Sequence, residues 1–292
     1  MLTQQLFNGL LLGATYCLVA LGFNLVVGAM DRLNFALGET AMVSAMIGAL
    51  LMGESGWPFA LAFLASTVAG GIVAVVVYFA SFRFVPKEYP TASILSSLGF
   101  GLMLTAIVTK FLGSDQRSVP DVLPNVRIDL GIFQVSGTQL VILVLAAVLT
   151  VGLYLFLEKT VWGTAIRGVS DDATMTGLLG VPVRRIILLT FALSGVLAGA
   201  AGLLTGLAFH TVSPFDGFNT TLTALMVIVV GGLGSVSGGV IAALAIGIIQ
   251  TLTVAYLSAT LRDLIVFILV GIVLLVRPQG LFGRNAGVLE RV

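Results

Sequence analysis

The sequence has little charge and is rich in apolar residues. Only 9% of its 292 residues are Asp, Glu, Lys or Arg, against about 25% in an average soluble domain, and 58% are hydrophobic. The 14 basic and 13 acidic residues leave a formal net charge of +1, so there is no basic field to attract a nucleic acid. The composition excludes an ordinary soluble domain and predicts a helical membrane protein with no nucleic-acid partner.

Cysteine and histidine are also scarce, since the chain has one of each, Cys17 and His210. A single cysteine cannot form a disulfide within the chain, and a single histidine cannot by itself build a histidine-rich zinc site or a proton relay. An intramembrane enzyme would need a nucleophile paired with a base, and His210 offers no such pair. We therefore expect no catalytic residue, no metal and no cofactor.

The chain lacks the residues of a nucleotide-binding loop. Its three lysines, Lys87, Lys110 and Lys159, each follow a residue other than glycine, so there is no Gly-Lys pair to hold phosphates. The glycine cluster at residues 231–239 does not fit a dinucleotide-binding turn, because Ser237 stands where the last glycine is required. If the protein uses ATP, a partner must hydrolyse it.

What the chain does contain is long runs without charge, and a transmembrane helix needs about 20 mostly apolar residues. Such runs are residues 1–30, 55–82, 89–109, 130–157, 186–215 and 217–261. The last run is long enough for two helices that separate at the glycine cluster, and the shorter apolar runs 34–52 and 264–276 add two more segments. Strand-like alternation is absent from these runs, so we expect helices.

These segments predict an all-α, polytopic integral membrane protein whose single transmembrane domain spans residues 1–292. We count about nine hydrophobic segments, and counts of eight and ten remain open. With nine, one set of connections and the C-terminal tail carry ten basic residues, and the other set carries four. Because basic residues gather on the cytoplasmic side, we expect the C-terminus inside and the N-terminus outside. Residues 1–30 are too long for a removable signal peptide and are expected to remain as a span.

The outer connections contain one long loop and one short turn. Residues 113–137 form an expected extracytoplasmic loop, in which the alternating runs Val126–Leu130 and Ile132–Val135 predict a small β-hairpin. His210 and Asp216 flank a later outer turn. We expect that turn to be solvated or to form a docking surface.

The inner connection, residues 158–185, is the other long loop. Ser170 or Asp171 is placed to cap a short helix that would end near Gly177 or Gly180. Such a helix would lie on the cytoplasmic surface. The alternative, that the segment is only a solvated connector, remains open.

Glu39 is the clearest ionisable residue inside an apolar segment. A carboxylate in lipid is costly unless it is paired or hydrated, so it is a candidate functional residue. In one interpretation Glu39 and Asn34 line the translocation path and Glu39 meets a cationic group of the solute. In the other, Asp31 or Asn34 caps a helix that starts here, and Glu39 interacts with the positive end of that helix.

Small residues recur at four-residue spacing between residues 186 and 209. Gly195 and Gly199 form one Gly-x-x-x-Gly pair, and Gly202 and Gly206 form the next. This spacing predicts close contact between helices. It also fits a helix that lines a narrow, mostly apolar path, so Gly195, Gly199 and Gly202 are candidate path residues.

Four short segments carry a family resemblance: Asn34–Glu39, Gly163–Gly180, Gly231–Ser235 and Arg277–Gly283. In this order they are similar to motifs of the membrane permeases of ABC importers for branched-chain amino acids, the Liv-type permeases. The resemblance covers nearly the whole chain. Two residues depart from it, because Leu37 stands where many relatives have His and Thr223 where many have Lys.

The resemblance implies a permease subunit that forms the path for branched-chain or other small amino acids across the bacterial inner membrane. It implies a second permease, related but distinct, two cytoplasmic ATP-binding subunits and an extracytoplasmic substrate-binding protein. Related importers carry urea or short amides, which leaves the substrate open. A stand-alone ion-coupled carrier or channel remains the alternative from another class, although such a carrier usually has more ionisable residues in its spans.

The inner connection is also the expected contact with an ATP-binding subunit, because no other inner connection is large enough to form an interface. The predicted coupling residues are Arg167, Asp171, Asp172, Met175, Leu178 and Leu179. We expect Arg167 to pair with one of the two aspartates. The three apolar residues, at spacings of three and four, are expected to present one apolar face to the membrane domain or to the partner.

Overall fold

The charge-free runs of the sequence form the long helices of the structure, a computed structural model that describes residues 2–85, 89–123, 127–129 and 134–283. In chain order the hydrophobic helices are α1 (Leu2–Met30), α2 (Leu37–Gly53), α3 (Phe59–Val77), α4 (Pro90–Leu112), α5 (Gly137–Lys159), α8 (Val183–Phe209), α9 (Asp216–Gly231), α10 (Val236–Tyr256) and α11 (Leu261–Val276). A π-helical turn, η1 (Tyr78–Phe82), extends α3. Each of the nine predicted segments is therefore a helix, and the all-α prediction is confirmed.

These helices differ in whether they are long enough to cross a membrane. Within the described residues, six are long and apolar enough: α1, α3 with η1, α4, α5, α8 and α10. The helices α2, α9 and α11 have 17, 16 and 16 residues. The predicted count of nine thus gives the number of hydrophobic helices and is approximate as a number of full spans.

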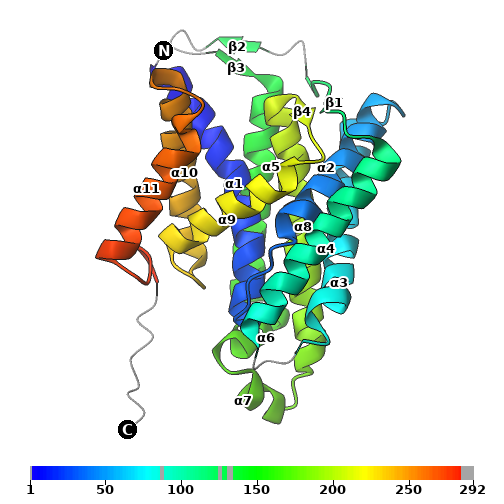
Figure 1. The fold of residues 1–292 in the computed structure, drawn as a ribbon, viewed down its shortest axis with the longest axis vertical. Helices are drawn as coiled ribbons and strands as arrows, with labels where there is room; N and C mark the ends of the chain where they lie inside the picture. Colours follow the sequence, from blue (N-terminus) through cyan, green and yellow to red (C-terminus); the bar gives the residue numbers. More distant parts are fainter. Residues whose placement is uncertain (1, 86–88, 124–126, 130–133, 284–292) are drawn as a thin grey trace.

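The connections gather at opposite ends of the bundle (Figure 1). At one end, β1 (Arg117–Ser118) pairs with β4 (Thr211–Val212), and β2 (Arg127–Asp129) pairs with β3 (Gln134–Ser136), both antiparallel. At the other end lie two short helices, α6 (Val161–Asp171) and α7 (Ala173–Leu178). We call these the ribbon end and the α6–α7 end. The helix α1 begins at the ribbon end and finishes beside α6.

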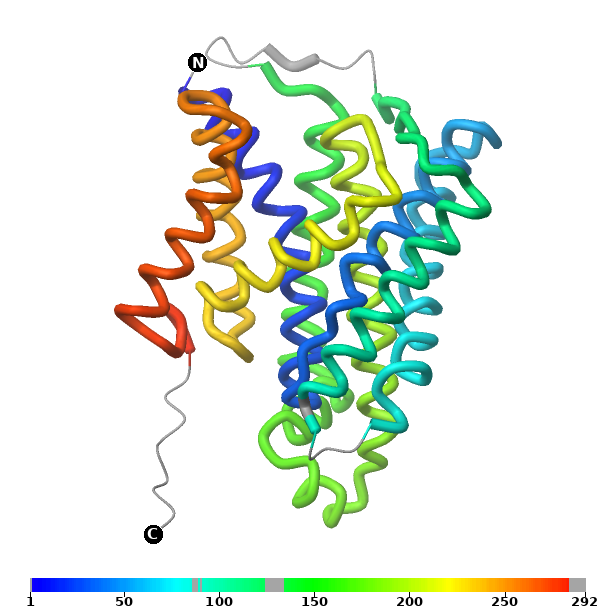
Figure 2. The backbone as a smooth tube through the Cα atoms, viewed as in Figure 1, coloured from blue at the N-terminus to red at the C-terminus, as the bar shows by residue number. Residues whose placement is uncertain are grey.

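The centre of the bundle is built around α1 and α8, with α2, α9 and α10 packed against them (Figure 2). Glycines allow the closest approaches. A Cβ atom at Gly199 of α8 would lie 2.6 Å from the carbonyl oxygen of Ser66 in α3, and one at Gly13 of α1 would lie 2.7 Å from the Cα atom of Leu244 in α10. Small residues therefore bring these backbones together, as the Gly-x-x-x-Gly spacing predicted.

The glycine cluster breaks the longest apolar run into α9 and α10, as predicted. Gly232 and Gly234 have φ angles of +102° and +81°, which favour glycine, in the turn between the two helices. The Asn24 side-chain oxygen of α1 accepts a hydrogen bond from the Gly234 amide at 2.7 Å. The amides of Leu281 and Phe282, from the segment after α11, donate to the last carbonyl groups of α9. The turn is therefore fixed from two sides.

Candidate functional site

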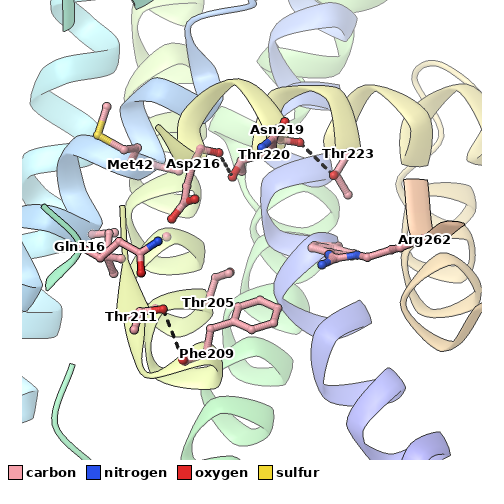
Figure 3. A pocket seen from close by; sticks show the side chains of 16 residues that line it. Met42, Gln116, Thr205, Phe209, Thr211, Asp216, Asn219, Thr220, Thr223 and Arg262 are labelled. Carbon is pink, nitrogen blue, oxygen red and sulfur yellow. Dashed lines mark hydrogen bonds between the residues drawn. The ribbon is translucent and has the colours of Figure 1, made fainter. Parts of the chain in front are cut away.

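A cavity of about 360 Å³ extends from the ribbon end into the bundle. Residues of α1, α2, α8, α9, β4 and the first turn of α11 line it (Figure 3). Its volume is at the lower end of the range of about 300–1,000 Å³ that is typical of small-molecule sites. Apolar side chains come from α2 and α8, and α9 contributes more polar side chains than any other element. We refer to this space as the cavity.

The wall of the cavity follows the periodicity of two helices. On α9 its residues are Asp216, Asn219, Thr220 and Thr223, and on α8 they are Gly202, Thr205, Gly206 and Phe209. Each set occupies positions i, i+3, i+4 and i+7, which lie on one face of an α-helix. One face of each helix therefore borders the cavity, while the other faces pack in the bundle.

Two charged side chains from different elements line the cavity. Arg262, in the first turn of α11, donates from Nε and Nη2 to the side-chain oxygen of Gln250 at 3.1 and 3.0 Å, and from Nη2 to the Tyr16 hydroxyl. Tyr16 in turn donates to Gln250 at 2.8 Å. Arg262 and Phe209 also line a second cavity of about 350 Å³ between α1, α8 and α10. The guanidinium group is thus held in place where the two cavities meet.

Asp216 is the acidic residue of the cavity wall, and it begins α9. Its Oδ2 atom accepts a hydrogen bond from the Ser213 amide at 2.8 Å, which fixes the turn before the helix. Figure 3 shows the carboxylate directed away from the helix axis, on the side where Gln116 and Thr205 lie. Because the side chain is exposed, it is available to a solute in the cavity.

The start of α2 lies inside the bundle, where the first-turn amides need partners from the protein. Asn34 and Leu37 are fully buried. The Thr221 hydroxyl of α9 accepts a hydrogen bond from the Gly38 amide at 3.0 Å and donates to the Phe35 carbonyl at 3.1 Å. Thr221 therefore caps α2 from a neighbouring helix.

Glu39 is enclosed where α2 meets α9. Its side chain is 5% exposed, its carboxylate lies against Gly217 of α9, and a Cβ atom at Gly101 of α4 would lie 3.0 Å from its Cγ atom. Among the described residues, its Oε2 atom has no hydrogen-bond partner. We name the set Asn34, Gly38, Glu39, Gly217 and Thr221 the α2–α9 joint.

The prediction that Asp31 or Asn34 caps α2 was wrong. The helix begins after Ala36, and no side chain of its own segment caps it. The Asn34 side-chain oxygen instead accepts a hydrogen bond from the Ala36 amide at 3.1 Å, which closes a local turn before the helix. The cap comes from Thr221, which is distant in sequence, and so local sequence patterns do not show it.

The predicted path residues lie in three different places. Gly202 is in the wall of the cavity. Gly195 and Gly199 face α3, where Gly70 and Ser66 contact them. Asn34 and Glu39 belong to the α2–α9 joint and are not part of the wall of either cavity.

The inner connection contains two helices where one was predicted. Asp172 caps α7, because its Oδ1 atom accepts hydrogen bonds from the amides of Thr174 and Met175 at 2.8 and 3.0 Å. The predicted caps, Ser170 and Asp171, were wrong, since both residues form the last turn of α6. The true cap, Asp172, lies one or two residues after the predicted positions, and α6 was not predicted.

The predicted coupling residues are at the surface of the α6–α7 end. Arg167 pairs with Glu158 at 3.0 Å, where we had expected one of the aspartates, and both side chains are about half exposed. Met175, Leu178 and Leu179 are 61%, 79% and 84% exposed. The three apolar side chains therefore form an uncovered apolar patch on and just after α7, which we call the α7 patch.

Sequence reasoning missed most of the cavity wall. The spacing of Asp216, Asn219, Thr220 and Thr223 was the signal that could have found it, since polar residues at helical spacing within an apolar run indicate one polar face. Arg262 gave no such signal, because its partner Tyr16 is 246 positions away. No group of three His, Cys, Asp or Glu residues that could hold a metal ion occurs in the described part of the chain.

Comparisons with known proteins agree with this architecture. A sequence model of the family described as "branched-chain amino acid transport system / permease component" matches residues 5–276. The high-affinity branched-chain amino acid permease protein LivH of Escherichia coli K12 is 32% identical, and the match covers 96% of this chain and 95% of LivH. BraD of Pseudomonas aeruginosa, with the same description, is 30% identical with the same coverage.

A solved structure supports the fold alone. A chain of PsaBC from Streptococcus pneumoniae, solved in complex with a Fab, superposes with a TM-score of 0.54 at 12% identity and covers 93% of this chain and 91% of that chain. The family match spans more than half of the sequence, and the relatives match over almost their whole length. The chain is therefore a multi-pass membrane protein that belongs to the family of permease components of branched-chain amino acid transport systems.

Proposed function

We propose that this chain is one of two permease subunits of an ATP-driven importer of branched-chain amino acids, and that the cavity is the outer part of its translocation path. The observation that carries the proposal is the family match over residues 5–276 together with a partly polar cavity at the ribbon end. The relatives LivH and BraD are described as permeases of branched-chain amino acid transport. The chain then acts by providing a path, and the ATP is hydrolysed elsewhere.

The proposed complex contains a second, related permease, two ATP-binding subunits and a substrate-binding protein at the bacterial inner membrane. The ribbon end faces outward in this arrangement, because the connections at that end carry four basic residues, whereas the other connections and the C-terminal tail carry ten. The binding protein would deliver its solute at that end. The ATP-binding subunits would contact the α6–α7 end.

Cysteine labelling tests the orientation. Single cysteines at Ser118 in β1 and at Thr174 in α7, both exposed positions, are placed in a Cys17→Ser background. An impermeant thiol reagent should label position 118 from outside intact cells and position 174 only after the membrane is opened. Labelling of position 174 in intact cells would reverse the orientation and remove the proposed contact with the ATP-binding subunits.

The α7 patch is the proposed coupling element, because three apolar side chains more than half exposed outside the apolar spans indicate a partner surface. Replacing Met175 and Leu178 together with Asp should detach the ATP-binding subunits and abolish solute-stimulated ATP hydrolysis. Arg167→Glu should have a smaller effect, since exposed ion pairs contribute under about 1 kcal/mol. The measurement is co-purification of the ATP-binding subunits, followed by ATP hydrolysis in lipid vesicles.

A matched control separates the loss of apolar contact from the added charge. Thr164→Asp with Thr174→Asp introduces two carboxylates at exposed positions of α6 and α7 without removing an apolar side chain. This double variant should retain the ATP-binding subunits. Equal association of both double variants would reject the α7 patch as the coupling element.

A further inference from the structure

We propose that Arg262 and Asp216 together bind the charged groups of an α-amino acid during its passage through the cavity. Arg262 takes the carboxylate and Asp216 takes the ammonium group. The two residues come from α11 and α9 and lie on opposite sides of the cavity in Figure 3. The inference rests on the proposed function, because it names the chemical class of solute that this path accepts.

Arg262 is prepared to receive an anion. Gln250 and Tyr16 occupy its Nε and Nη2 atoms, and Gln250 is itself 1% exposed, so the guanidinium group is fixed by a buried partner. The Nε atom also lies 4.0 Å from the carboxylate of Asp263, which is 70% exposed. Among the described residues, the Nη1 atom has no hydrogen-bond partner. The side chain is 30% exposed. A guanidinium edge in this state offers the planar geometry that carboxylates bind. Gln250 and Tyr16 act as positioning residues.

Asp216 supplies the opposite charge at the other side of the cavity. One carboxylate oxygen accepts from the Ser213 amide, and among the described residues the other oxygen has no hydrogen-bond partner. No ion pair in the described part of the chain joins Asp216 to Arg262 or to another cation. The two charges therefore do not cancel each other by direct contact, and each can bind one group of a zwitterion.

The apolar part of the wall fits the remainder of such a solute. Ala41, Met42 and Ala45 of α2 and Phe209 of α8 border the same space. An aliphatic side chain would contact these groups while its charged groups are held by Arg262 and Asp216. A solute with only one of the two charges makes only one of the two charged contacts, which disfavours it relative to a zwitterion.

The test measures binding by the assembled complex without its substrate-binding protein, so that any selectivity belongs to the permease. Saturation-transfer NMR is recorded with millimolar L-leucine, with L-leucinamide, which lacks the carboxylate, and with 4-methylpentanoate, which lacks the amine. The wild-type complex should prefer L-leucine to both analogues. Arg262→Met should weaken L-leucine binding about tenfold and remove its advantage over L-leucinamide. Asp216→Asn should remove its advantage over 4-methylpentanoate.

Conservative and matched variants keep the test decisive. Arg262→Lys, which keeps the charge and loses the fork, should retain the preference for L-leucine over L-leucinamide at reduced affinity. Arg117→Met and Asp115→Asn make the same charge changes at the ribbon end outside the cavity wall and should bind as the wild type does. Only variants that co-purify with their partner subunits are compared.

The outcomes separate this inference from the proposed function. Failure of the wild-type complex to take up L-leucine with ATP and the binding protein would overturn the proposed function. Uptake by the wild type, with no detectable L-leucine binding or with unchanged selectivity in both Arg262→Met and Asp216→Asn, would overturn the two-charge site alone. Stronger binding of urea than of L-leucine to the wild type would also overturn it, because a neutral solute has no need of either charge.

Discussion

The α2–α9 joint and the cavity lie on different faces of the same helix, α9, and each contains one carboxylate. Glu39 in the joint is 5% exposed and lies against Gly217. Asp216 in the cavity wall is exposed and accepts a hydrogen bond from the turn before its helix. One face of α9 therefore packs against a buried carboxylate from α2, while the other face carries an exposed carboxylate of its own.

This difference shows that a charge inside an apolar segment does not by itself identify a transport path. Glu39 is near the N-terminal ends of α2 and α9, where the helix dipoles favour a negative charge. It borders neither cavity, so a solute in these spaces does not reach it. We infer that the joint fixes the start of α2, and that the cavity face of α9 meets the solute.

The largest expected effect comes from adding one methyl group to the joint. A Cβ atom at Gly38 would collide with the Gly217 carbonyl and with Thr221, whereas one at Gly99 of α4 meets nothing within 4 Å. Gly38→Ala should destabilise the protein by about 3 kcal/mol through overpacking and loss of the Thr221 contact, and Gly99→Ala should be neutral or slightly stabilising. Thermal unfolding in detergent measures both, and equal midpoints would contradict a tightly packed joint.

A pair of threonines on α9 sharpens the comparison. Thr221 bonds to both the Gly38 amide and the Phe35 carbonyl, while the Thr223 hydroxyl, in the cavity wall, donates only to the Asn219 carbonyl of its own helix. Thr221→Val leaves the buried Gly38 amide and the partly buried Phe35 carbonyl without partners and should cost about 2 kcal/mol.

Thr223→Val is the matched substitution two residues away, and it should change stability by under about 0.5 kcal/mol. Its effect should appear in transport, because the methyl group replaces a hydroxyl that borders the cavity. Transport normalised to assembled complex, measured beside the unfolding midpoint, separates the two roles. A greater loss of stability in Thr223→Val than in Thr221→Val would reverse the assignment of the two faces.

The sequence predicted the helices well because apolar runs and glycine breaks are local signals. The separation of α9 from α10 followed from Gly231–Gly239, and the pairing of β2 with β3 lies where the alternating residues predicted a hairpin. The helix α6 was missed although local signals were present: the Thr160 side chain caps it, and its buried residues Gly163, Ile166 and Val169 recur every three positions. Local patterns were therefore sufficient for the helices, and α6 could have been found from the same kind of pattern.

The site was harder to predict, because its contacts join residues that are far apart in the chain. Thr221 caps α2 across 183 positions, and Arg262 reaches Tyr16 across 246. The sequence identifies Glu39 as an isolated charge in an apolar segment. It does not show that Gly101 and Gly217, from two other helices, enclose the side chain. Composition shows that a charge is unusual, and only the packing shows whether a cavity reaches it.

Within the α2–α9 joint, the smallest expected effect is that of Glu39→Gln, which keeps the size of the side chain and removes its charge. Loss of the interaction with the two helix ends should cost about 1 kcal/mol, offset in part because a neutral amide is easier to bury than a carboxylate. The yield of assembled complex and its unfolding midpoint should fall slightly. The relative uptake of L-leucine, L-isoleucine and L-valine, normalised to assembled complex, should stay the same.

Glu39→Gln is also the variant that can break the comparison between the two faces. If Glu39 meets the solute, its charge contributes to binding, and the ranking of the three amino acids or of their amides should change while assembly stays normal. If it serves the joint, assembly changes and the ranking does not, whereas Asp216→Asn gives the reverse result. A changed ranking in Glu39→Gln at wild-type assembly would extend the path through the joint and require α2 and α9 to separate there during transport.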